Sequence, residues 1–218
     1  PDAVIGTGGY LSGPVLLAAQ KKKIPTFLHE ANAFPGVTIK LLSKKADVVF
    51  LAFGEAKAHL PTERPCVVVG NPVRQEFLTA TRAEARKKLG LDDAFTIFSV
   101  GGSSGANAIN KMAADIMAWH CKEGKINHIH GYGKHGRENF PKMLEERGID
   151  LNDYPRIQAR EYIDDMALWT AAADLVISRA GAITISELEV LGKPSILVPY
   201  PYAAENHQYH NAKVLEDH

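Results

Sequence analysis

The chain has 218 residues and a mass of 23.8 kDa, which allows one large domain or parts of two. Its composition, with 45% hydrophobic and 23% charged residues, excludes disorder, collagen and coiled coil as overall classes. Twenty-five Lys and Arg balance twenty-five Asp and Glu, so there is no global basic field for a nucleic acid, and any anion must be bound locally. Cys66 and Cys121 are too few for a disulfide framework and match no zinc spacing, which makes a reducing cytoplasm the expected compartment. The longest apolar run, Val48 to Phe53, is far shorter than the roughly 20 residues of a membrane span.

Strand-like runs and helical patterns alternate along the chain. The predicted strands are Ala3–Ile5, Thr26–His29, Val48–Ala52, Val67–Val69, Thr96–Val100, Ile126–His130, Leu175–Ser178 and Ser195–Val198. Apolar residues recur every three or four positions in the predicted helices Pro14–Lys22, Arg82–Leu89, Ala106–Lys122, Arg137–Arg147, Asp164–Ala172, Ile183–Leu191 and Asn206–Glu216. This alternation predicts an α/β fold with parallel strands, helices on both faces, and ligands at the carboxyl ends of the strands.

A glycine-rich turn between a strand and a helix occurs twice, at Ile5–Gly13 and at Val100–Ala106. Two nucleotide-binding halves would explain the repetition. The boundary between them is expected at Gly70–Arg74, where a strand ends and Pro72 disfavours helix in the residue before it. The chain starts without Met and stops inside a helical pattern that has no C-cap, so we expect a fragment that lacks both termini.

Glycine-rich turns let the backbone approach a phosphate, and the helix that follows supplies free N–H groups and the positive end of its dipole. Each turn taken alone is equally well explained by packing. A third strand-to-helix turn, Ser178–Glu187, has the same character around Gly181. The Glu187 carboxylate can accept two hydrogen bonds from a ribose diol, or else cap the start of the helix.

Two other binding chemistries fit the sequence less well. Gly131–Gly136 matches the dinucleotide fingerprint, but the following helix is predicted to start only after its glycines, and the chain has no P-loop. The pair His128 and His130 shares a strand face, and His207 and His210 lie three apart on a helix. Neither pair has a third ligand at a recognisable spacing, so no metal site is predicted.

Seven motifs, in the same order over the whole chain, resemble the MurG family of peptidoglycan glycosyltransferases. They are Gly6–Pro14, His29–Asn32, Gly70–Arg74, Gly101–Ala106, Tyr162–Met166, Arg179–Glu187 and Ala204–Ala212. The resemblance implies the GT-B fold, in which two Rossmann-like domains face a cleft. Residues 1–73 would be the C-terminal part of an acceptor-binding domain, and residues 74–218 a donor-binding domain truncated at its C-terminal end. The implied reaction transfers N-acetylglucosamine, with inversion, from UDP-N-acetylglucosamine to the 4-hydroxyl of the muramyl sugar of lipid I, and so forms lipid II for the cell wall.

The resemblance also implies roles for single residues. The implied donor contacts are Asn32 and Gln208 at the sugar, Arg74 and Ser103 at the diphosphate, the backbone of Ile163 at uracil, the amides of Ala182, Ile183 and Thr184 at the phosphate, Glu187 at the ribose, and His207, where the family often has a glutamine. The implied acceptor diphosphate site is Gly8, Gly9, Tyr10, Ser12 and Gly13. His29 and Glu30 are the local candidates for the general base, against a structural role for both. No metal and no cofactor are expected, because helix N-termini and Arg74 would stabilise the departing UDP.

The implied partners are UDP-N-acetylglucosamine, lipid I and the cytoplasmic face of the bacterial membrane, on which the protein would lie peripherally. No nucleic acid is expected. Two other activities stay open: a UDP-N-acetylglucosamine 2-epimerase would need no lipid acceptor, and a nicotinamide oxidoreductase would bind NAD in place of UDP. A third alternative is a piece that binds its nucleotide without catalysis. Because family residues that would precede Pro1 are absent, the expected behaviour is donor binding with little or no lipid II synthesis.

Overall fold

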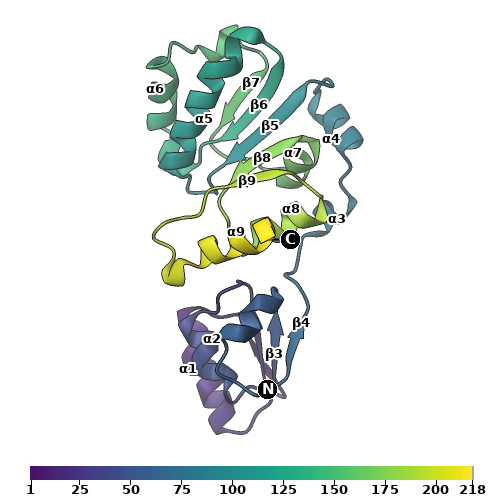
Figure 1. Ribbon diagram of the computed structural model, residues 1–218, viewed down its shortest axis with the longest axis vertical. Helices are drawn as coiled ribbons and strands as arrows, with labels where there is room; N and C mark the ends of the chain where they lie inside the picture. Colours follow the sequence, from purple (N-terminus) through teal and green to yellow (C-terminus); the bar gives the residue numbers. More distant parts are fainter. Residues whose placement is uncertain (218) are drawn as a thin grey trace. The chain divides into compact units, whose positions relative to one another are not determined.

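The computed structural model describes residues 1–217 and divides the chain into two compact units (Figure 1). The first unit comprises Pro1–Pro72, Ala180–Ser186 and the segment from Pro199 onward; the second comprises Val73–Arg179 and Glu187–Val198. Each unit contains one sheet, and all paired strands run parallel. The expected α/β fold with two parallel sheets is therefore confirmed.

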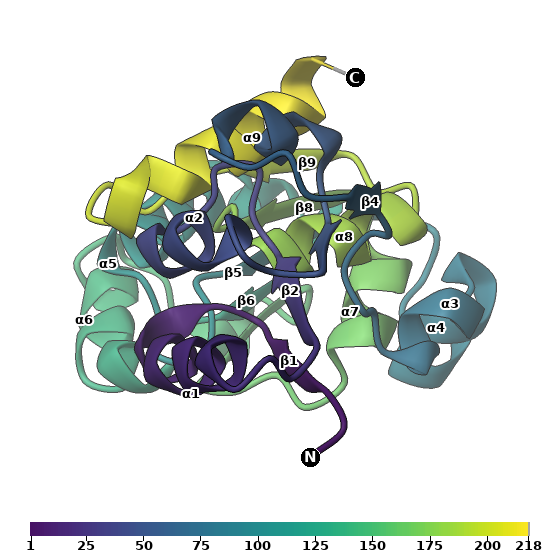
Figure 2. The same ribbon diagram turned by 90° about the horizontal axis from the view of Figure 1, so that it is seen from below.

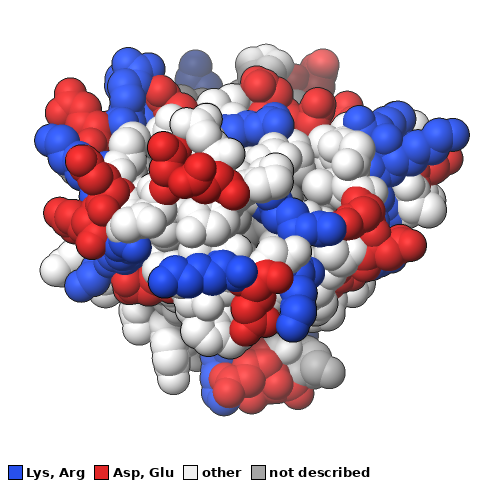
Figure 3. All heavy atoms as spheres, turned by 90° about the horizontal axis from the view of Figure 1, so that it is seen from above, with Lys and Arg blue, Asp and Glu red and all other residues white. Residues whose placement is uncertain are grey.

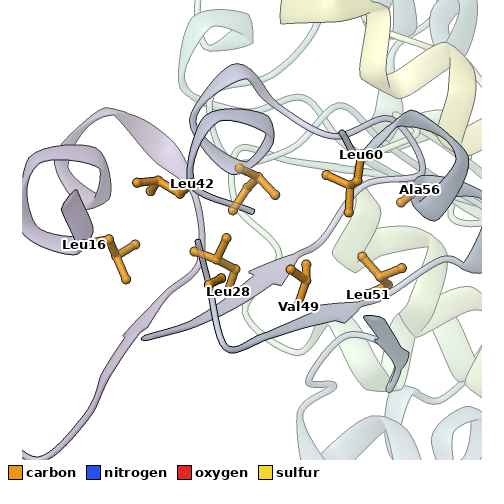
Figure 4. Packing of buried hydrophobic residues seen from close by; sticks show 9 residues of the cluster. Leu16, Leu28, Leu42, Val49, Leu51, Ala56 and Leu60 are labelled. Atoms are coloured by element: carbon orange, nitrogen blue, oxygen red, sulfur yellow. The ribbon is translucent and has the colours of Figure 1, made fainter. Parts of the chain in front are cut away.

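The first sheet has four strands in the order β1-β2-β3-β4. They are β1 (Val4–Gly6), β2 (Thr26–Glu30), β3 (Val48–Leu51) and β4 (Cys66–Val68). Helices α1 (Gly9–Lys21) and α2 (Val37–Ser43) pack against the sheet and against each other (Figure 2). Because alternate residues of a strand share a face, Leu28 of β2 and Val49 and Leu51 of β3 all point into one core. Leu16 of α1 and Leu42 of α2 complete this cluster, which fixes both helices on the sheet (Figure 4).

Helix α1 starts earlier than the sequence predicted. The preference of proline for the first helical turn predicts a start at Pro14, whereas the helix begins at Gly9 and encloses Pro14. Proline has no N–H for the carbonyl of Tyr10, four residues before it. Tyr10 is 88% exposed, so this turn faces water, which can satisfy the carbonyl in place of the missing N–H.

The second sheet has five strands in the order β7-β6-β5-β8-β9. They are β5 (Phe95–Val100), β6 (Ile126–Gly131), β7 (Ile157–Arg160), β8 (Leu175–Ser178) and β9 (Ser195–Leu197). The helices around it are α5 (Asn107–His120), α6 (Asn139–Glu145), α7 (Met166–Ala172) and α8 (Ala182–Val190). Phe98 and Ile129 pack with Trp169 of α7 and Leu188 of α8. Met117 of α5 packs with residues of α6 and β7 in a second cluster, so this sheet is buried on both faces, as an all-parallel sheet requires.

The remaining helical segments connect these layers. They are α3 (Gln75–Thr79), α4 (Arg82–Leu89), α9 (His207–Asp217) and the 3₁₀ turns η1 (Gly54–His59), η2 (Cys121–Glu123), η3 (Lys134–Gly136), η4 (Leu151–Asp153) and η5 (Ala204–Asn206). Arg86 of α4 is 4% exposed and donates to the carbonyls of Asp92, Ala94 and Ala172 and to Asp174 Oδ2. A buried guanidinium with these partners joins α4 to the sheet.

All eight predicted strands are present, with no end displaced by more than one residue. Strand β7 was missed because Ile-Gln-Ala-Arg has a single β-branched residue. The short helices α2 and α3 were also missed, because five to seven residues carry too little periodicity. The first sheet lies before the expected boundary at residues 73 and 74 and the second after it. Assigning acceptor and donor roles to 1–73 and 74–218 stays a prediction.

Charge is mixed on the surface, as the equal numbers of acidic and basic residues suggest. Figure 3 shows Lys and Arg interspersed with Asp and Glu over one face of the molecule. Within residues 1–217, no helix has both the length and the apolar character needed to cross a membrane.

Candidate active site

The first unit contains a pocket of about 350 Å³ at the carboxyl ends of β1 and β2. It lies between the starts of α1 and α2 and the segment that leads into α9. It is lined by the candidate base Glu30, by the predicted donor contacts Asn32 and His207, and by Gly8, Gly9 and Tyr10 of the predicted acceptor site. The position agrees with the expectation that ligands of parallel sheets bind where the strands end.

Glycine is required where α1 opens onto this pocket. Gly8 and Gly9 have φ angles of 86° and 75°, in the left-handed region that favours glycine. The first-turn N–H groups of α1 lie at the pocket, as an anion site needs. The Ser12 hydroxyl donates to the Gly8 carbonyl at 2.6 Å, so Ser12 braces the turn from inside the helix. Gly13 lies in α1 opposite Thr38 of α2, where a Cβ would make an ordinary contact at 3.6 Å, so the packing of the two helices does not require glycine there.

Glu30, a candidate base, organises the loop after β2. Its Oε1 accepts from the backbone N–H of Asn32 at 2.8 Å and from Asn32 Nδ2 at 3.1 Å, and its Oε2 accepts from the N–H of Gly36 at 3.0 Å. The residue is 4% exposed. Both carboxylate oxygens are therefore occupied in holding residues 31–36, which favours a positioning role.

Asn32 is fixed from its other side by Asn211 of α9. Asn211 Nδ2 donates to Asn32 Oδ1 at 3.0 Å, and Asn211 Oδ1 accepts from the N–H of Ala33 at 2.8 Å. Asn211 is fully buried, and its Nδ2 also lies 3.3 Å from the carbonyl of Ala180. The sequence analysis did not assign Asn211 a role. Its place three residues after Gln208, on the same face of one helix, is the signal that could have found it.

An ion pair and a strained turn border the same pocket. Lys40 Nζ lies 3.0 Å from Glu205 Oε2 and 4.0 Å from the centre of the Phe34 ring. Glu205 and Asn206 have φ angles of 55° and 51°, a conformation that costs non-glycine residues energy and collects at functional sites. The turn leads directly into α9.

The two predicted sugar contacts on α9 have defined hydrogen bonds. His207 Nδ1 lies 2.8 Å from the carbonyl of Ala204, which can only accept, so Nδ1 carries the proton and Nε2 has the free lone pair. Gln208 Oε1 accepts from the N–H of Tyr200 at 2.8 Å, which leaves its amide N–H groups for a ligand. His207 lines the pocket described above, whereas Gln208 does not.

His29 and Asn71 connect the first sheet to the segment that follows β4. His29 Nε2 donates to the Gly70 carbonyl at 3.0 Å, so the basic nitrogen of the neutral ring is Nδ1. Asn71 Nδ2 lies 3.1 Å from the Ala31 carbonyl and 3.2 Å from Ser186 Oγ. These bonds tie the expected hinge segment to the first unit.

In the second unit, Arg74 and Glu187, two predicted donor contacts, form an ion pair that the sequence analysis did not anticipate. Arg74 Nη2 is 3.4 Å from Glu187 Oε1, and the Glu187 side chain is 11% exposed whereas that of Arg74 is 58% exposed. Burial raises the pKa of Glu187, and the charge and hydrogen bond of Arg74 oppose this rise. Glu187 lies in the middle of α8, so it does not cap the helix start. Ala182, Ile183 and Thr184 form the first turn of that helix, where N–H groups have no partner within the helix.

Ser103 belongs to a second glycine-rich turn, which we call the glycine loop (Gly101–Gly105). The loop lies on the segment after β6: the N–H of Lys134 donates to the Ser103 carbonyl at 3.1 Å, and the N–H of His135 to the Ser104 carbonyl at 2.9 Å. A Cβ on Gly105 would collide with the carbonyl of Tyr132. Ser103 itself is exposed. Helix α5 begins two residues after the loop, so this turn has the form of a phosphate site.

Ile163 is buried, and its side chain belongs to the core cluster around Trp169. A Cβ on Gly131 would lie only 2.9 Å from Ile163 Cγ1. The absence of a side chain at Gly131 therefore lets strand β6 and the segment around Ile163 pack closely. The nearby fingerprint-like glycines end in a 3₁₀ turn, and α6 begins only at Asn139. This confirms that the glycines of 131–136 do not open a helix.

A row of buried polar residues, which we call the histidine chain, lies on the α5 face of the second sheet. Its members are His120, His128, Ser99 and His130. Ser99 Oγ lies 2.8 Å from both His128 Nε2 and His130 Nδ1, and His120 Nε2 is 3.2 Å from His128 Nδ1. Burial lowers the pKa of His130 to about 4 and lowers the pKa values of His128 and His120 in the same direction. All three rings are neutral at pH 7. The sequence analysis placed His128 and His130 on one face, and the structure confirms it.

Metal-ligating side chains do not gather at either site. Among residues 1–217, no group of three or more His, Cys, Asp or Glu side chains is arranged to hold a metal ion.

Two family models match this chain, in the same order along the sequence as the two sheets. Residues 1–51 match the glycosyltransferase family 28 N-terminal domain, and residues 96–218 match the glycosyltransferase family 28 C-terminal domain. A curated protein of Desulforamulus reducens is 44% identical over the whole chain, and one of Acetivibrio thermocellus is 48% identical over 99% of it. Both are named UDP-N-acetylglucosamine–N-acetylmuramyl-(pentapeptide) pyrophosphoryl-undecaprenol N-acetylglucosamine transferase. The chain spans 58–59% of the length of these relatives.

Solved structures agree with the fold. The crystal structure of Acinetobacter baumannii MurG is 36% identical, with a TM-score of 0.76 over 99% of this chain and 57% of that one. A UDP-N-acetylglucosamine 2-epimerase from Neisseria meningitidis superposes with a TM-score of 0.67 over 94% of this chain and 61% of its own, but at 17% identity it shows the fold alone. The fold is the GT-B type. Because both domain models match in order and one covers more than half of the residues, the chain belongs to glycosyltransferase family 28.

Proposed function

We propose that the chain is the greater part of an inverting glycosyltransferase that moves N-acetylglucosamine from UDP-N-acetylglucosamine to the 4-hydroxyl of the muramyl sugar of lipid I. The observation that carries the proposal is the 44–48% identity, over essentially all of this chain, to relatives with that printed activity. The site geometry supports it, because the pocket of the first unit gathers six of the residues that the reaction would use.

Donor binding would draw on four features described above. The Glu187 carboxylate would accept from the ribose hydroxyls, and Arg74 would then be free to turn to the diphosphate. The α8 first-turn amides and the glycine loop with Ser103 would hold the phosphates. Asn32, Gln208 and the Nε2 of His207 offer neutral polar groups to a sugar. UDP leaves with negative charge, and helix N-termini and a guanidinium stabilise such charge most where water is excluded.

We assign the first glycine-rich turn, Gly8 to Gly13, to the acceptor diphosphate. The α1 N-terminus is the group there that favours an anion. Lys40, close by, is paired with Glu205. Between the two candidate bases, the hydrogen bonds favour His29, whose Nδ1 keeps a free lone pair, over Glu30, whose oxygens hold the loop. In a protein extended at both ends to the length of its relatives, transfer should vanish in His29→Gln while UDP-N-acetylglucosamine affinity stays unchanged.

Peripheral membrane association is part of the proposal, since lipid I is a membrane lipid. Large apolar side chains are exposed on the two helices beside the acceptor pocket: Tyr10, Leu11 and Val15 on α1, and Val37 and Leu41 on α2. Exposed apolar groups of this density mark interaction surfaces. Co-sedimentation with anionic vesicles should fall in a Leu11→Ser, Leu41→Ser variant and stay unchanged in Leu78→Ser, an exposed leucine of the second unit. Equal sedimentation of the wild-type chain, the double variant and Leu78→Ser would contradict the assignment.

The test of the function is a parallel calorimetric titration of the chain with UDP, UDP-N-acetylglucosamine and NAD, followed by incorporation of radiolabelled sugar into a lipid I analogue. The proposal predicts binding of both uridine nucleotides and no binding of NAD. Labelled product should need the lipid analogue, and it should form with a protein extended to the length of the relatives and little or not at all with the 218 residues alone. Binding of NAD in place of UDP, or release of UDP-N-acetylmannosamine without any lipid, would refute the proposal and favour one of the alternatives.

A further inference from the structure

Asn110 of α5 is placed to hold the segment that supports the glycine loop. Its Nδ2 donates to the Tyr132 carbonyl at 3.0 Å, and its Oδ1 lies 3.1 Å from His130 Nε2. The residue is 2% exposed. The Tyr132 carbonyl is the atom with which a Cβ on Gly105 would collide. Asn110 therefore holds the atom that sets how closely the glycine loop can approach.

The segment after β6 and the glycine loop fit together with almost no free space. A Cβ on Gly133 would collide with the backbone of Gly105, and a Cβ on Gly136 would meet Asn110 Nδ2 at 2.6 Å. With backbone against backbone, a shift of the Tyr132 carbonyl must pass directly to the loop that carries Ser103.

The Tyr132 carbonyl decides which atom donates in each hydrogen bond from Asn110 along the histidine chain. The Tyr132 carbonyl only accepts, so Asn110 must present its amide to Tyr132 and its oxygen to His130. His130 is then protonated on Nε2, and its Nδ1 accepts from the Ser99 hydroxyl. Ser99 Oγ in turn accepts from His128 Nε2, whose Nδ1 accepts from His120 Nε2. All three neutral histidines are thereby assigned the Nε2–H tautomer.

The opposite direction would gain a bond at His130 and fail at Asn110. A proton on Nδ1 of His130 would be donated to the Ser99 carbonyl, 3.1 Å away, a bond that the Nε2–H tautomer gives up. His130 Nε2 would then need a donor, and Asn110 would have to turn its amide to His130 and its oxygen to the Tyr132 carbonyl. Two oxygens would face each other 3.0 Å apart in a buried place, which costs the full desolvation of both.

We propose that Asn110 is a positioning residue for the glycine loop, and that the histidine chain holds its amide in the one orientation that supports the Tyr132 carbonyl against Gly105. The inference deepens the proposed function, because it takes this loop to bind the donor diphosphate through Ser103. Asn110 touches no ligand; it acts through the loop.

The test compares UDP with uridine. Asn110→Asp has the same shape and still accepts from His130, but it places a carboxylate oxygen against the Tyr132 carbonyl. UDP affinity should fall about tenfold or more, whereas uridine, which lacks the diphosphate, should bind within about twofold of wild type. Asn139→Asp, an exposed position at the start of α6, is the matched control and should change neither. Equal losses for UDP and uridine, or no loss for UDP, would overturn the positioning role.

A second measurement needs no variant. Long-range ¹H–¹⁵N correlation spectra distinguish the two neutral histidine tautomers, and His120, His128 and His130 should all show Nε2–H at neutral pH. An Nδ1–H tautomer at His130 would mean that Asn110 is turned the other way and would overturn the proposal. Failure of the wild-type chain to bind UDP would instead refute the proposed function, and leaves the tautomers to be read from the spectra.

Discussion

Acidification from pH 7 to pH 5 is expected to destabilise the second unit through the buried histidines. Burial lowers the pKa of His130 from 6.5 to about 4. Between these values the unfolded chain binds a proton that the folded chain does not, so stability falls as the pH falls through 6.5, and the loss is complete only below about 4. At pH 7 the ring is neutral in both states, so the contribution there is close to zero.

The magnitude follows from the distance between pH 5 and the unfolded pKa. At about 1.4 kcal/mol per pH unit over one and a half units, His130 alone lowers the free energy of unfolding by about 2 kcal/mol at pH 5. His128, whose pKa burial also lowers, acts in the same direction. With a urea m-value of about 2 kcal/mol/M, the midpoint should fall by about 1 M or more.

The assay is urea unfolding at pH 7, 6 and 5 followed by tryptophan fluorescence. Both tryptophans, Trp119 on α5 and Trp169 on α7, lie in the second unit and so report on it directly. In His130→Gln the loss between pH 7 and pH 5 should shrink by about 2 kcal/mol, whatever the stability of the variant at pH 7. His135→Gln removes an exposed histidine and should leave the loss as in wild type. Identical losses in wild type and His130→Gln would refute the reasoning.

Three further predictions concern single contacts. Glu187→Ala should weaken UDP binding by about 2 kcal/mol, because a charge-assisted bond to the ribose is lost, and a folded variant with unchanged affinity in calorimetry would remove Glu187 from the site. Arg86→Met should lower the free energy of unfolding by about 3 kcal/mol, since it removes one of the two guanidinium groups that pair with Asp174 and a buried donor to three carbonyls, and a loss below 1 kcal/mol in urea would show that the network relaxes without cost. Gly105→Ala should reduce UDP affinity more than uridine affinity, because the added methyl collides with the Tyr132 carbonyl and φ is 84°; unchanged UDP affinity would show that the loop tolerates displacement.

The sequence was most informative where the chain is buried on both sides. Strands such as Leu175–Ser178 are short apolar runs between turn signals, and they were predicted with the same ends that the structure has. The start of α1 was missed because Pro14 points to a first turn, whereas solvent at Tyr10 lets the helix extend back to the glycines. Helix α2 is too short for a periodic signal, although its start lines the pocket.

The site shows a similar limit. Residues at the ends of strands, such as Glu30, could be placed at the pocket from the topology alone. Their roles depend on partners far along the chain: Asn211 holds Asn32, and Asn110 faces His130. Side chains that touch no ligand and pair across long sequence distances leave no local pattern, so only the folded structure identifies them.

The order of strands in the second sheet also sets an order of assembly. Strand β5 is central: it pairs with β6, where Ile97 lies opposite His128, and with β8, where Ile97 lies opposite Leu175. The second pairing closes a much longer loop, so its entropic cost is higher, while β6 and α5 follow β5 directly along the chain. The β5–α5–β6 segment is thus the natural nucleus, and the β8–β9 edge, where Ile196 is 49% exposed, joins late and opens early. Amides of β9 should therefore exchange with solvent well before those of β5 and β6.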